Sequence, residues 1–181
     1  MTEKKIRAMF KQANEARHEG RFNDAESLLN QAFELSVDIS DEDIHAEYVS
    51  KLAQIKRDLN NPSEAIDLYE EAIECYRHLG RNLAIAHCLR HLGDIQRENG
   101  DISKAETHLL SALDIYRDLP TKESLAIANT LRPLALLNEA LGRMDRAMAF
   151  WSEALAYYSE AKVEAGIAEC RAHLDGYSPS Q

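Results

Sequence analysis

The sequence contains little cysteine, proline or glycine, and each shortage excludes a class of protein. Its three cysteines, Cys75, Cys88 and Cys170, are odd in number and form no C-x-x-C pair. Neither a disulfide framework nor a zinc cluster is therefore expected. Four prolines and seven glycines in 181 residues are too few for a disordered chain. We expect a folded protein with reduced thiols.

Long apolar runs and a surplus of positive charge are also missing. Nowhere do about 18 apolar residues follow one another, and the first residues lack the apolar stretch of a signal peptide. We therefore expect a cytoplasmic protein without a membrane segment. The 31 acidic residues outnumber the 21 basic ones and give a formal net charge of −10. Because this charge would repel a phosphate backbone, nucleic acid is not an expected partner.

One phrase occurs four times along the chain. Its anchoring alanines stand 40, 40 and 42 residues apart, at Ala25, Ala65, Ala105 and Ala147. A large apolar residue follows four positions later in each copy, at Leu29, Tyr69, Leu109 and Trp151, and a second alanine comes three positions after that. This spacing predicts one face of a helix that packs closely on another helix. Trp151 is therefore predicted to be a core residue.

The periodicity predicts helices throughout and no strand. The expected helices cover residues 3–19, 22–36, 41–59, 63–79, 82–99, 102–118, 122–141, 144–160 and 163–174. Asn61, with Pro62 after it and Glu64 three residues on, is typical of a helix start. Gly20, Gly100 and Gly142 are expected at turns, and Pro133 falls inside the seventh helix, where it removes one backbone hydrogen bond.

The order glycine, alanine, large apolar residue, alanine resembles the second half of a tetratricopeptide repeat. The paired residues Leu52-Ala53, Leu92-Gly93 and Leu134-Ala135 resemble the first half. The long period is similar to that of kinesin light chain-type and bacterial regulatory repeats. The resemblance implies an all-α, right-handed superhelical stack of antiparallel helix pairs. It divides one domain, 1–176, into repeats 3–38, 41–79, 82–119 and 122–160, a capping helix 163–174 and a polar tail, 177–181.

The resemblance also implies a concave groove lined by the first helix of each pair. The side chains that alignment of the repeats places there are Asn14, Arg17, Gln54, Arg57, Arg90, Arg97 and Arg132. Guanidinium groups bind carboxylates and amides bind a peptide backbone. We therefore expect the groove to bind a partner protein or peptide, through an acidic segment or a free C-terminus. The alternative is that the arginines only pair with nearby acids, such as Asp58, Asp94 and Glu98.

Two other functions compete with peptide binding. A self-associating structural module, such as a homodimer, would use apolar residues of the first repeat, namely Met1, Ile6 and Met9. An enzyme would need a cluster of titrating groups, for which His87, His91 and Asp94 are the candidates. The sequence contains no nucleophile elbow, phosphate-binding loop, dinucleotide fingerprint or zinc motif. We therefore expect no catalytic residue, no metal and no cofactor, and Cys88 is interpreted as a small packing residue.

Overall fold

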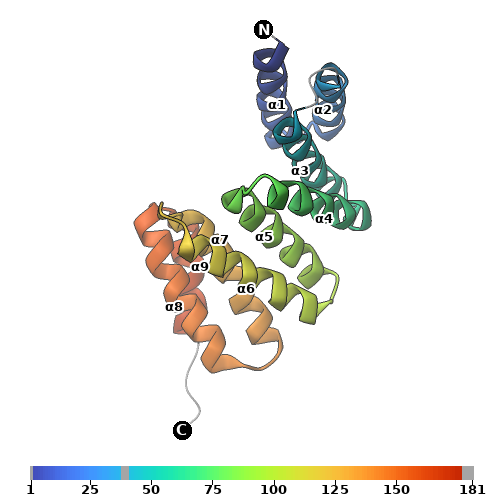
Figure 1. Ribbon diagram of the computed structural model, residues 1–181. Coiled ribbons are helices and arrows are strands. Elements are labelled where there is room, and N and C mark those ends of the chain that lie inside the picture. Colours follow the sequence, from blue (N-terminus) through green and yellow to red (C-terminus); the bar gives the residue numbers. More distant parts are fainter. Residues whose placement is uncertain (1, 38–40, 177–181) are drawn as a thin grey trace. The chain divides into compact units, whose positions relative to one another are not determined.

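A computed structural model of the chain describes residues 2–37 and 41–176. Within these ranges the chain forms α-helices and turns and no strand (Figure 1). The helices are α1 (Thr2–His18), α2 (Phe22–Ser36), α3 (Glu42–Asp58), α4 (Pro62–His78), α5 (Asn82–Glu98), α6 (Ile102–Asp118), α7 (Ser124–Ala140), α8 (Met144–Ala161) and α9 (Glu164–Asp175). Their ends differ from the predicted ones by at most two residues, so the all-α prediction is confirmed.

The chain divides into two compact units, Met1–Cys88 and Leu89–Gln181, with the boundary inside α5. In the N-terminal unit α1 packs on α2, and α3 packs on α4. In the C-terminal unit α7 packs on α8, with α6 against α7 and α9 against α8. Each unit thus consists of consecutive helices that cover one another's apolar faces.

The repeated alanine and large apolar positions form the core of both units. Every member of the four triads has no exposed surface. They are Ala25, Leu29 and Ala32; Ala65, Tyr69 and Ala72; Ala105, Leu109 and Ala112; and Ala147, Trp151 and Ala154. Two small residues let the helix backbones approach, and the large residue between them fills the remaining space. The predicted core face, including Trp151, is confirmed.

The turn inside each repeat places one residue in the left-handed region. That residue is Gly20, Asn60, Gly100 or Gly142, each with φ between 59° and 82°. The following residue donates its N–H to a carbonyl five residues earlier, as Arg21 does to Ala16 at 2.9 Å. This bond closes the end of the first helix and reverses the chain. Glycine and asparagine occupy the position because most side chains clash there.

The start of α4 shows the predicted capping chemistry. The side-chain oxygen of Asn61 accepts a hydrogen bond from the N–H of Glu64, and Pro62 occupies the first turn. The amide of Asn61 donates in return to the Glu64 carboxylate at 2.7 Å. Asp41 caps α3 similarly by accepting from the N–H of Ile44 at 3.2 Å. These side chains replace the backbone partners that a first helical turn lacks.

Pro133 lies inside α7, as predicted, and the helix continues through it to Ala140. The proline is buried among apolar neighbours, because α7 lies between α6 and α8 and is covered on two sides. Burial on two sides explains why the apolar residues of α7 are not confined to one stripe. No helix in the described ranges is long and apolar enough to cross a membrane.

The last helix, α9, packs on α8 through aromatic contacts. The ring of His173 stacks on Trp151, with centroids 4.1 Å apart and an angle of 16° between the planes. The indole N–H of Trp151 donates to Glu139 at 2.7 Å, and Nδ1 of His173 lies 2.8 Å from the same carboxylate oxygen. Glu139 occupies, in the fourth repeat, the position that Arg17, Arg57 and Arg97 hold in the first three. Its carboxylate connects α7 to both α8 and α9.

One prediction about the first repeat is wrong. Ile6 was expected to be exposed and available for self-association, but it is fully buried and packs in one cluster with Phe10 and Leu29. Met9 is only partly buried, whereas Met1 and the tail 177–181 lie outside the described residues. Ile6 is one of the apolar residues through which α1 packs on α2. This packing buries its side chain.

The contact between α9 and α8 gives a test of the packing. A Cβ atom at Gly166 would lie 2.6 Å from two carbons of the Tyr158 ring. The ring cannot turn away easily because its hydroxyl donates to Asn129 at 2.8 Å. We therefore expect Gly166→Ala to lower the free energy of unfolding by about 1 kcal/mol, since overpacking outweighs the gain in helix propensity. Chemical denaturation measures this change.

The matched control is Gly176→Ala at the other end of α9, where φ is −72° and the nearest atom to an added Cβ is 3.3 Å away. This variant is expected to change stability by less than about 0.5 kcal/mol. Equal stability of the two variants would show that α9 does not pack tightly on Tyr158.

Candidate peptide-binding face

Three of the predicted site residues meet at a small pocket in the N-terminal unit. Asn14 and Arg17 come from α1 and Gln54 from α3, and Lys51 completes the polar rim. Ala13, Leu29 and Ile55 form the apolar walls. The cavity of about 10 Å³ is the size of one water molecule. We call it the amide pocket, because the amide side chains of Asn14 and Gln54 line it. These two residues occupy equivalent positions in successive repeats.

Within residues 2–37 and 41–176, the two amides of the pocket have no hydrogen-bond partner. Among the described residues neither Asn14 nor Gln54 makes a side-chain hydrogen bond, and both are half-buried. Arg17 is partly committed, because its Nη1 donates to Asp58 at 2.9 Å. Its Nε is buried without a hydrogen-bond partner in the described part of the chain. The pocket therefore presents amide and guanidinium donors that the fold itself does not use.

Lys51 belongs to this pocket and was not predicted. Its ammonium lies 3.4 Å from Glu47 on the same helix, so it adds a paired positive charge to the rim. The sequence carries a signal for it, since Lys51 precedes Gln54 by three positions and shares its helix face. Arg57 lies in the last turn of α3, half-buried, and already makes contacts within the chain.

In the C-terminal unit the predicted arginines mostly have acidic partners. Arg97 donates to Asp94 at 3.0 Å and lies 3.5 Å from Glu98, so the alternative of internal ion pairing holds for this residue. Arg132 donates to Glu169 of α9 at 2.8 Å. This hydrogen bond is the main reason that the pKa of the Arg132 guanidinium is raised.

Arg90 differs from the other two arginines of this unit. One of its terminal nitrogens lies 2.8 Å from Nε2 of His91. Its Nε is buried, and no group in the described part of the chain accepts a hydrogen bond from it. Arg90 and Arg132 both act electrostatically on the Tyr158 hydroxyl, so their side chains approach the same region of the unit.

Ion pairs between equivalent positions of successive repeats are a general feature of the surface. Their members stand 36 to 41 residues apart in the sequence. They are Arg7–Glu47, Arg17–Asp58, Arg81–Asp43, Arg117–Glu153, Arg132–Glu169 and Arg143–Glu106. The separation equals about one repeat, because side chains on neighbouring parallel helices lie side by side. Some arginines of the predicted face therefore form ion pairs between repeats, whether or not they also bind a ligand.

The titrating residues considered for an enzyme all lie on α5. His87, His91 and Asp94 each make contacts with other groups of the chain. The described ranges contain no group of three or more histidine, cysteine, aspartate or glutamate side chains placed to hold a metal ion.

Comparison with known proteins identifies the repeat. A family model described as tetratricopeptide repeat matches residues 5–78, 45–118 and 83–160. The chain belongs to the tetratricopeptide repeat family. No curated protein sequence matches it. The tetratricopeptide matches overlap and span most of the helices, in agreement with the predicted repeats.

Solved structures with a similar fold include tetratricopeptide proteins of several kinds. A putative kinesin light chain from Podospora anserina is 16% identical, with a TM-score of 0.74 over 94% of this chain and 83% of that chain. Aspartyl phosphate phosphatase F from Bacillus subtilis is 15% identical, with a TM-score of 0.84 over 93% of this chain. A Rap protein complexed with Competence and Sporulation Factor is 20% identical, with a TM-score of 0.75 over 88% of this chain. This chain covers 44% of each of the last two.

The cysteines provide a test of the packing around the candidate face. Burial raises the pKa of the Cys170 thiol to about 11, and Cys88 is also buried, whereas Cys75 is half-buried. At pH 8 only about a thousandth of Cys170 is thiolate, against roughly a quarter of an unfolded cysteine. With Ellman's reagent we therefore expect only Cys75 to react in the native protein, and all three thiols to react in denaturant.

The variant Cys75→Ser is the control for this experiment. It should leave the native protein without a reactive thiol while retaining two in denaturant. Rapid native modification of Cys88 or Cys170 would contradict their assignment as packing residues.

Proposed function

We propose that this tetratricopeptide chain is a protein-binding module without enzymatic activity, and that an extended segment of a partner lies across the mouth of the amide pocket and bonds to its two amides. Family membership supports the general role. The Rap structure supports it further, because that protein, which has a similar fold, is complexed with Competence and Sporulation Factor. The amide pocket is the feature of this chain that would carry the interaction.

The single observation behind the proposal is the pair of uncommitted amides. Asn14 and Gln54 lie on neighbouring first helices, and each offers one acceptor and two donors to a ligand. An extended peptide presents backbone N–H and C=O groups that such amides can bind. Because both amides are only half-buried, a ligand that bonds to them replaces water, and each hydrogen bond adds a modest amount to the affinity.

The charges around the pocket favour an acidic segment or a free C-terminal carboxylate. Arg17 retains an unused buried Nε, and Lys51 lies on the rim. Guanidinium groups form the strongest hydrogen bonds with carboxylates. Within the C-terminal unit, Arg90 and Arg132 offer guanidinium groups of the same kind, although Glu169 already holds Arg132. Binding of this kind requires no cofactor.

The test measures binding of labelled peptides by fluorescence anisotropy. The probes are a nine-residue glutamate-rich peptide with a free C-terminus, its amidated form and a lysine-rich peptide of the same length. We expect the acidic peptides to bind and the double variant Asn14→Ala/Gln54→Ala to bind them about tenfold more weakly. Two lost hydrogen bonds of roughly 1 kcal/mol each, partly replaced by water, account for that factor.

The matched control is Gln12→Ala/Gln31→Ala, which removes two exposed amides outside the pocket. It should bind like the wild type, and circular dichroism should show both double variants to be folded. Equal weakening in the two double variants, or no binding of either acidic peptide, would refute the assignment of the pocket. A difference between free and amidated peptides would identify a terminal carboxylate as the ligand group.

A further inference from the structure

A second surface of the N-terminal unit has the opposite chemistry to the amide pocket and shares no residue with it. A cleft of about 410 Å³ opens between the end of α2 and the start of α3. It is lined by Phe33, Ser36, Val37, Asp41, Glu42 and His45. Val37 is 60% exposed, the largest fraction among the exposed large hydrophobic residues of the described ranges. The volume is enough for one or two side chains of a ligand.

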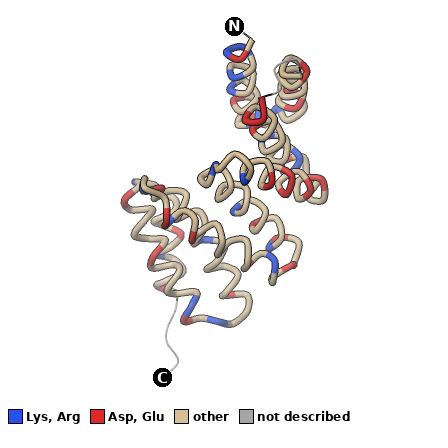
Figure 2. The backbone as a smooth tube through the Cα atoms, viewed as in Figure 1, with Lys and Arg blue, Asp and Glu red and all other residues tan. Residues whose placement is uncertain are grey.

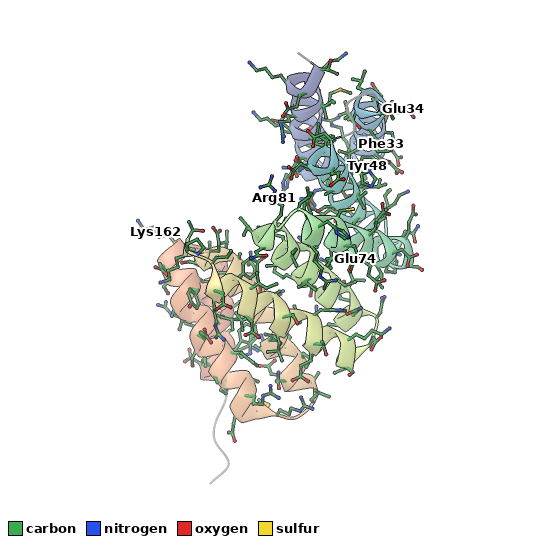
Figure 3. The ribbon with its side chains drawn as sticks, in the orientation of Figure 1. Phe33, Glu34, Tyr48, Glu74, Arg81 and Lys162 are labelled. Carbon is green, nitrogen blue, oxygen red and sulfur yellow. The ribbon has the colours of Figure 1, made fainter. Side chains whose placement is uncertain are left out.

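Aromatic rings form one wall of the cleft. Phe33 stacks on Tyr48, with centroids 4.4 Å apart and 17° between the planes, and the ring of His45 lies 5.8 Å from Phe33. The Tyr48 hydroxyl donates to Asn30 at 3.0 Å, so the stacked pair is held in place. Figure 3 labels Phe33 and Tyr48 beside Glu34 where α2 faces α3. The rings are half-buried and keep part of their surface in solvent.

Carboxylates surround this aromatic wall. Glu42 and Asp41 line the cleft, and Glu34 and Glu71 both act electrostatically on the Tyr48 hydroxyl. Glu71 also lies 3.2 Å from the His45 ring. Figure 2 shows acidic residues along α4 and at the start of α3, within the same unit.

Two of these carboxylates are uncommitted. Among the described residues neither Glu34 nor Glu42 has a hydrogen-bond or ion-pair partner, and both are exposed. Two nearby cations are already used, since Arg77 pairs with Glu74 and Arg81 pairs with Asp43. The cleft and its rim therefore combine half-buried aromatic rings with two carboxylates that pair with no cation in the described ranges.

We propose that this aromatic and acidic cleft binds an arginine-bearing segment of a partner protein. A guanidinium is planar, stacks on aromatic rings and forms paired hydrogen bonds with carboxylates. Phe33 supplies the stacking surface, and Glu34 and Glu42 supply the acceptors. The aliphatic stem of the arginine covers Val37. The net charge of −10 also attracts a cationic segment from a distance.

The experiment uses the full chain and a fluorescein-labelled peptide of twelve residues, with three arginines in a glycine and serine background. Two further peptides replace arginine by lysine or by citrulline, which has the shape of arginine without its charge. We expect the arginine peptide to bind at least tenfold more tightly than the citrulline peptide and about threefold more tightly than the lysine peptide. Anisotropy titrations at low salt measure these ratios.

Variants locate the binding to the cleft. Glu34→Gln/Glu42→Gln should weaken binding of the arginine peptide at least fivefold. Phe33→Leu should remove the preference for arginine over lysine, because it keeps an apolar side chain but no ring. The control Asp114→Asn/Asp118→Asn makes the same change of net charge on α6, at two exposed residues of the C-terminal unit. It should leave the binding nearly unchanged.

Three results would overturn the proposal. Equal binding of the arginine and citrulline peptides would exclude recognition of the charge. Equal weakening by the cleft variant and its control would reduce the effect to net charge alone. Concentration-dependent self-association that disappears in Glu34→Gln/Glu42→Gln, measured by sedimentation, would make a second copy of this chain the occupant of the cleft in place of a partner protein.

Discussion

The close approach of two helices at an alanine, large residue, alanine triad is the contact on which the other features depend. At Ala147, Trp151 and Ala154 none of the three side chains is exposed, so the backbones lie as near to each other as side chains permit. The contact also requires the chain to reverse within a few residues, and Gly142, with φ of 68°, allows this. Each helix pair then leaves one apolar face for its neighbour, which is how α9 covers Trp151.

The packing also determines where polar side chains meet. Because successive first helices are spaced by the triads, a side chain on one helix lies beside its equivalent about one repeat later. Arg17 with Asp58 and Arg132 with Glu169 are examples. An exposed ion pair contributes only about 0.2–1 kcal/mol, so these pairs add little stability compared with the buried triads. They decide instead which cations remain available to a ligand, and both Arg17 and Arg97 already have acidic partners.

The fold could be predicted almost completely from the sequence, whereas the site could be predicted only in part. The spacing of apolar residues predicts the helices and the core. A period of 3.6 residues places these residues on one side of a helix, whichever helix packs against that side. Pairing between side chains depends on the offset between helices, which the sequence does not contain. Arg17 was therefore grouped with possible ligand contacts although it binds Asp58. Ile6 was expected on the surface because a first repeat has no preceding neighbour, yet its stripe packs on α2. The cleft beside Phe33 was missed because it arises where α2 and α3 face each other.

The groups that remain without partners follow from the composition. With 31 acidic and 21 basic residues, the cations can be paired internally and a surplus of carboxylates cannot. Some carboxylates of this chain must therefore lack a cationic partner. Their positions in the structure indicate where a cationic ligand is attracted. In the described part of the chain some unpaired acids, such as Asp114 and Asp118, lie exposed on a helix surface, whereas Glu34 and Glu42 lie near the half-buried rings of Phe33 and His45 (Figure 3). Charge next to a ring favours a planar cation over a simple ion, since both the carboxylate and the ring attract it.

Uncommitted amides are a different case, because neither charge balance nor packing requires them. Asn14 and Gln54 lie at equivalent positions of successive repeats, and the same position holds Asp94 in the third repeat and Leu136 in the fourth. The absence of a partner for these two amides within the described residues is the reason that we proposed a peptide ligand for them.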